Sequence, residues 1–75
     1  MAKANVFQSA KVFLATVGTF KKEIAMGILT ADVKLQTAED LLGELPNVEG
    51  ISQKDAEQCR RYLEFQIRIS TASVA

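Results

Sequence analysis

Few side chains in this 75-residue sequence are suited to chemistry. There is no histidine, the commonest general base and metal ligand in proteins, and the single cysteine is Cys59. One cysteine without histidine builds neither a zinc cluster nor an intrachain disulfide. Cys59 falls on the apolar stripe of a predicted helix, so we expect a small buried hydrophobic side chain there rather than a reactive thiol beside Arg60.

Three carboxylates, Glu39, Asp40 and Glu44, are the other candidates for chemistry. A hydrolase could use two such carboxylates, but no apolar pocket that would shift their pKa values is predicted beside them. We therefore expect a solvated helix face. The four glycines are isolated and form no phosphate-binding loop. These observations predict a protein that is not an enzyme, with no catalytic residue, cofactor or metal.

The turn at residues 46–52 carries the clearest structural signals. Pro46 lacks a backbone donor and disfavours helix in the residue before it, so an upstream helix is predicted to stop near Glu44. Gly50 can adopt the positive φ angle that a tight turn requires. Ser52 is a favourable N-cap for a helix that starts directly after it.

The helix after this turn is predicted to run from Gln53 to about Ser70. Residues 70–75 are small and weakly patterned, so we expect a frayed tail or a segment ordered by a neighbouring molecule. The predicted apolar stripe consists of Ala56, Cys59, Leu63 and Ile67. The predicted pairs of opposite charge, four residues apart, are Glu57–Arg61 and Glu64–Arg68.

The residues around the turn follow a spacing of apolar residue, any residue, Gly, apolar residue, Gly or Ser, three residues, Ala, two residues and an apolar residue. The positions are filled by Val48, Glu49, Gly50, Ile51, Ser52, Ala56 and Cys59. Residues 37–62 thus resemble a helix-hairpin-helix motif. The resemblance implies that N–H groups at the start of the second helix hold a nucleic-acid phosphate. The implied contacts are Gly50, Ile51, Ser52 and Lys54, with Arg60 and Arg61 as auxiliary charges.

The chain departs from that pattern in two ways. Pro46 and Asn47 lengthen the hairpin, and Glu49 places a negative charge where a phosphate would lie. Binding to nucleic acid regardless of sequence depends on several basic side chains, whereas this segment is acidic up to Gly50. An ordinary capped helical hairpin is therefore the alternative interpretation.

Before the turn, apolar residues recur at intervals of three and four, which places them on one face of a helix. They are Val6, Ala10, Phe13, Val17, Phe20, Ile24, Ile28, Ala31, Leu35, Ala38, Leu42 and Leu45. A glycine within a helix costs about 1 kcal/mol relative to alanine. We predict that the helix is broken near Gly18 or Gly27, with one long helix as the alternative.

A strand interpretation competes in two places. Residues 29–35 and 63–69 alternate between apolar and polar, as a half-buried strand does. However, hairpin signals such as Asn-Gly are missing, and two strands alone are marginal in water. The predicted fold is therefore all-α: a single small domain of residues 1–75, in which a long or broken N-terminal helix packs on a second helix as a helical hairpin. A small α+β fold is the alternative.

The size and charge distribution of the chain favour association. A chain this short buries little of its surface, and without disulfide or metal its core is completed most simply by another molecule. Residues 1–22 hold four lysines and no acid, whereas residues 23–49 hold six acids and only Lys34. We predict a structural or assembly module that binds copies of itself or a protein partner. The predicted self-association residues are Val6, Phe13, Val17, Phe20, Ile24, Ile28 and Leu35.

Residues 1–22 suggest a further function because they are both basic and amphipathic. Such a segment could lie on an anionic membrane surface or in a partner's groove, although an apolar stripe is more often the core. No signal peptide or membrane-spanning stretch is recognised, which predicts a cytoplasmic location. A small monomer that folds alone is the remaining alternative.

Overall fold

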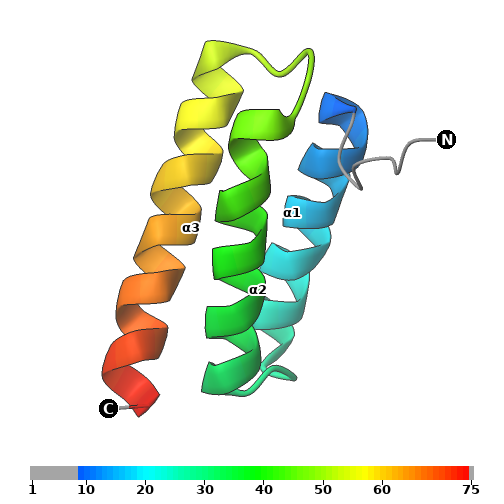
Figure 1. Cartoon of the computed structure of the whole chain (residues 1–75). Coiled ribbons are helices and arrows are strands. Elements are labelled where there is room, and N and C mark those ends of the chain that lie inside the picture. The colour runs from blue at the N-terminus through cyan, green and yellow to red at the C-terminus, as the bar shows by residue number, and fades with distance from the viewer. Residues whose placement is uncertain (1–8, 75) are drawn as a thin grey trace, which may run out of the picture.

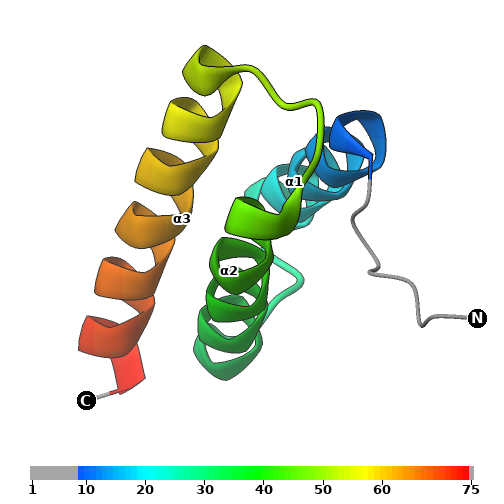
Figure 2. The ribbon, with the colours of Figure 1, turned by 45° about the horizontal axis from the view of Figure 1, so that its top comes forward.

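A computed structural model of the chain describes residues 9–74, which form three α-helices and one short 3-10 helix. The helices are α1 (Ala10–Met26), α2 (Ala31–Glu44), η1 (Leu45–Asn47) and α3 (Gln53–Val74). Helices α2 and α3 pack side by side and antiparallel, and α1 runs at an angle to them (Figures 1 and 2). The predicted all-α hairpin is confirmed.

The α+β alternative is wrong, because the described residues contain no strand beyond one isolated bridge between Ser9 and Glu49. Residues 31–35 belong to α2 and residues 63–69 to α3. The apolar alternation that suggested strands instead places apolar side chains on opposite faces of a helix, since alternate residues lie roughly 200° apart.

The N-terminal helical region is broken at Gly27 and not at Gly18. Gly27 has a φ of 73° and caps α1, with its N–H donating to the carbonyl of Ile24 at 3.0 Å. Only glycine adopts this left-handed conformation without steric cost, which explains the break. Gly18 continues within α1. Helix α2 then begins after Thr30, whose hydroxyl accepts a hydrogen bond from the N–H of Val33.

The turn between α2 and α3 is built as its residues predict. Helix α2 ends at Glu44, and Pro46 lies in η1. Gly50 has a φ of 81°, and the hydroxyl of Ser52 accepts a hydrogen bond from the N–H of Asp55 at 3.1 Å. These interactions end one helix, reverse the chain and begin the next.

Helix α3 extends to Val74, so the prediction that it ends near Ser70 is wrong. No proline or glycine interrupts residues 53–74, and Ser70 is buried. Residues 71–74 therefore continue the helix.

The core lies where the three helices meet. Its buried side chains are Phe13, Val17, Phe20, Ala38, Leu41, Leu45, Val48, Cys59 and Leu63. Phe20 of α1 meets the ring of Tyr62 of α3 edge to face, with the ring centroids 6.4 Å apart. The ammonium of Lys21 lies 4.7 Å from the centroid of the same ring. Aromatic and cation–π contacts thus add to the apolar packing that holds α1 on the hairpin.

Candidate interaction surface

The helix face that was predicted to mediate self-association is divided between the core and the surface. Phe13, Val17 and Phe20 are buried within the chain itself. Two others, Ile24 and Leu35, are half-buried, Ile28 is exposed, and Val6 lies outside the described residues. The period of an apolar pattern marks a buried face but does not say whether the same chain or another one covers it. Here the chain covers much of this face itself.

Another apolar surface lies on α3, and the sequence interpretation did not identify it as an interaction site. Phe65 and Ile69 are 52% and 39% exposed and lie one helical turn apart on the same face. The signal in the sequence was the alternation of Leu63, Phe65, Ile67 and Ile69. In a helix, this pattern gives one apolar face to the core and another to the surface.

The buried side of α3 becomes polar over the same turns. Gln66 and Ser70 are buried, and Ser70 is only 1% exposed. Among the described residues, neither the Oε1 of Gln66 nor the Oγ of Ser70 has a hydrogen-bond partner. Buried polar atoms normally have a partner, because leaving one without costs about 1–3 kcal/mol. The last turns of α3 therefore carry apolar side chains outside and unpaired polar atoms inside.

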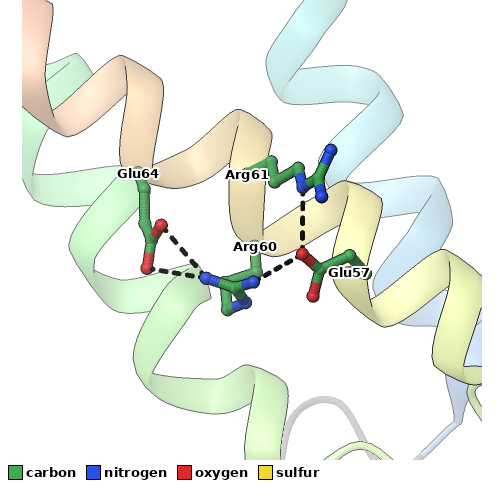
Figure 3. A network of polar contacts seen from close by, with 4 residues as sticks. All are labelled: Glu57, Arg60, Arg61 and Glu64. Atoms are coloured by element: carbon green, nitrogen blue, oxygen red, sulfur yellow. Dashed lines mark hydrogen bonds and ion pairs between the residues drawn. The ribbon is translucent and has the colours of Figure 1, made fainter.

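The charges on the exposed side of α3 form a local network (Figure 3). Glu57 accepts hydrogen bonds from both Arg60 and Arg61, and Arg60 also donates to Glu64 at 3.3 Å. The hydrogen bond from Arg60, followed by that from Arg61, lowers the pKa of Glu57 below its ordinary value. Glu64 thus pairs with Arg60, and the predicted Glu64–Arg68 pair is wrong. Within residues 9–74, Arg68 forms no ion pair.

Helix α2 presents an acidic surface. Asp32, Glu39 and Asp40 are exposed, and Lys34 is the only basic residue of this helix. The amide of Gln36 donates to Asp40 at 2.9 Å, but no carboxylate of α2 forms an ion pair within the described residues. These negative charges are thus not neutralised by neighbouring basic groups at contact distance.

The residues of the hairpin serve the fold in several ways. Ile51 is half-buried against the core, and the hydroxyl of Ser52 caps its own helix. Gly50 makes the turn, Lys54 is exposed, and Glu49 is exposed on the same loop. Arg60 and Arg61, the auxiliary charges of the proposed motif, are held by carboxylates of α3. Nucleic-acid contact at this turn stays a prediction.

Described residues of the basic N-terminal segment lie in α1. Lys11 and Lys22 are exposed, while the apolar face of the helix, including Phe13 and Phe20, is buried on the hairpin. Inserting that face into a membrane would require α1 to leave the core. No helix among the described residues is long and apolar enough to span a membrane.

Cys59 is buried, and burial is the main cause that raises the pKa of its thiol. A raised pKa leaves less of the reactive thiolate at neutral pH. The described residues contain no cluster of three potential metal ligands and no pocket. The carboxylates of Glu39 and Asp40 are exposed to solvent.

Comparisons with protein-family models, with curated proteins and with solved structures find no match for this chain. What the geometry offers is surface chemistry: an exposed apolar pair on α3 with basic and acidic side chains around it, and an acidic face on α2.

Proposed function

We propose that this chain is a non-enzymatic assembly module that associates with copies of itself through exposed apolar helix surface. One observation carries the proposal: the last turns of α3 place Phe65 and Ile69 outside while Gln66 and Ser70 are inside. A helix whose only partners were the other helices of its own chain would gain more stability with the apolar side chains turned inward.

The energetics support association at this surface. Burying a large apolar side chain completely contributes about 1.5–3 kcal/mol relative to exposure. Covering two half-exposed side chains would therefore contribute roughly 2 kcal/mol to association. Exposed apolar patches on soluble proteins commonly mark interaction sites for this reason.

The charge distribution also supports a second copy of the chain as the partner. The chain is neutral overall, with nine basic and nine acidic residues, yet three exposed acids, Asp32, Glu39 and Asp40, lie on α2. Basic residues stand on α1 and on α3, where Arg68 is not paired with the helix's own acids within the described residues. A second copy presents both signs of charge and so can match each surface, whereas a nucleic acid or an anionic membrane would be repelled by α2.

The oligomeric state tests the proposal. We expect sedimentation velocity and light scattering to give masses above the 8.2 kDa of one chain, rising with protein concentration. The midpoint of thermal unfolding should rise with concentration as well, because association stabilises only the folded chain. A mass of one chain at every concentration, into the millimolar range, would contradict the proposal.

A further inference from the structure

Two surfaces of the chain are complementary to each other, one on α3 and one on α2. The α3 surface consists of Arg61, Phe65, Arg68 and Ile69, and we call it the α3 face. The α2 surface consists of Asp32, Val33, Gln36 and Asp40, and we call it the α2 face.

The α3 face points away from the core. Arg61 and Phe65 lie two positions before and after the buried Leu63, and two positions turn a helix by roughly 200°. Arg68 and Ile69 lie one turn beyond Phe65 on the same side, and all four residues are exposed. The face therefore combines an apolar centre with Arg68, which forms no ion pair within residues 9–74, whereas Arg61 is paired with Glu57.

The α2 face points outward for the same reason. Gln36 and Asp40 lie two positions before and after the buried Ala38, and Val33 lies one turn before Gln36. Val33 is 45% exposed, and Asp32 stands beside it. This face combines an apolar side chain with two negative charges.

We infer that the α3 face of one copy docks on the α2 face of a second copy, an inference that rests on the proposed self-association. Phe65 and Ile69 would cover Val33, and Arg68 would lie near Asp32 or Asp40. If the α3 face paired with another α3 face, Arg68 would meet no unpaired carboxylate, because Glu57 and Glu64 are already bound by Arg60 and Arg61. Asp32 and Asp40 of the α2 face form no ion pair within the described residues. Charge complementarity therefore selects the α2 face as the occupant.

Helix α1 also carries basic side chains, but it is a weaker candidate than α3 for the surface that docks on the α2 face. Its exposed large apolar residues, Val12 and Met26, are separated by about four helical turns, whereas Phe65 and Ile69 are adjacent. A contiguous apolar pair excludes water better than two separated side chains.

Docking of this kind is heterologous, because the two faces in contact are different. Helices α2 and α3 pack against each other, so their outward faces point away from one another. Each docked copy keeps one face free, and assembly continues until a ring closes or a filament forms.

The test uses two variants that each remove one face. Val33→Glu places a third negative charge at the centre of the α2 face, and Phe65→Glu removes the apolar centre of the α3 face. We expect each variant alone to stay at the mass of one chain in sedimentation velocity. An equimolar mixture should form a 1:1 dimer and stop there, because only one intact α3 face and one intact α2 face remain to pair.

A matched control distinguishes the loss of the interface from a general effect of adding a negative charge to the surface. Val12→Glu changes a valine of nearly the same exposure, 47%, on α1. This variant should assemble as the unaltered chain does. Circular dichroism of all three variants should show the helix content of the unaltered chain, since each replaced side chain is exposed.

The possible outcomes are distinguishable. If the unaltered chain assembles and neither variant changes its assembly, the inference is overturned while the proposed function stands. If Phe65→Glu alone is monomeric and Val33→Glu assembles normally, α3 pairs with a surface other than the α2 face, which also overturns it. If the unaltered chain is monomeric throughout, the proposed function fails as well.

Discussion

At the scale of single residues, serine has two opposite roles in this chain. The hydroxyl of Ser52 accepts a hydrogen bond from the N–H of Asp55 and so satisfies a donor at the start of α3. The hydroxyl of Ser70 is buried in the same helix and has no partner among the described residues. The same atom type thus stabilises the fold at one position and opposes it at the other.

The same substitution at both positions tests this contrast. Ser52→Ala should lower the free energy of unfolding by about 1 kcal/mol, because the cap is lost. Ser70→Ala should raise it by about 1 kcal/mol, because an unpaired buried hydroxyl is removed. Urea unfolding followed by circular dichroism measures both, at one protein concentration. A loss of stability in Ser70→Ala would mean that its hydroxyl has a partner in solution.

At the scale of elements, two glycines of one helical region have different effects. Gly18 is exposed inside α1, and Gly27 ends α1 with a φ of 73°. A Cβ atom would meet no neighbouring atom at either position, so the backbone conformation alone decides the effect of a side chain. The length of α1 and the start of α2 follow from this one conformation.

Alanine substitutions at these two glycines should therefore change the free energy of unfolding in opposite directions. Gly18→Ala should stabilise the chain by about 1 kcal/mol, since alanine favours the helix interior. Gly27→Ala should destabilise it by about 1–2 kcal/mol, since a Cβ atom disfavours the left-handed conformation. Thermal and urea unfolding provide the comparison. Stabilisation by both substitutions would argue for a continuous helix through residue 27.

At the scale of the whole molecule, charge and apolar surface are distributed over different helices. Helix α2 is acidic, while the outer side of α3 combines Phe65 and Ile69 with arginines, of which Arg68 forms no ion pair within residues 9–74. Residues 9–74 bury their core with three helices but leave these two surfaces uncovered. Under the proposed self-association, the segregation of sign would steer two copies into one relative orientation, and the apolar side chains would add stability once they meet.

This division of roles predicts the effect of salt on assembly. Raising the salt concentration from about 0.01 M to 1 M shortens the Debye length from about 30 Å to about 3 Å, so the proposed attraction between the α2 and α3 faces should weaken. The apparent association constant measured by sedimentation should therefore fall with sodium chloride. A rise with salt would indicate a contact made by apolar surface alone.

Several features of the fold follow from the sequence alone. Pro46, Gly50 and Ser52 act on the backbone of their immediate neighbours, so the turn and the start of α3 are predictable without tertiary information. The same holds for the burial of Cys59 and Leu63, which lie on a regular apolar stripe. Local conformational preferences and periodicity need no knowledge of what packs where.

Tertiary packing determines which apolar side chains are buried within the chain and which stay on its surface. The apolar ladder of α1 is the same whether Phe13 and Phe20 meet their own hairpin or a second molecule, and only the folded chain shows that they meet Tyr62, Leu63 and their neighbours. The alternation around Phe65 is equally compatible with a strand until the helix is known to continue to Val74. Burial depends on which segments distant in sequence come together, so the candidate surface on α3 emerged only from the structure.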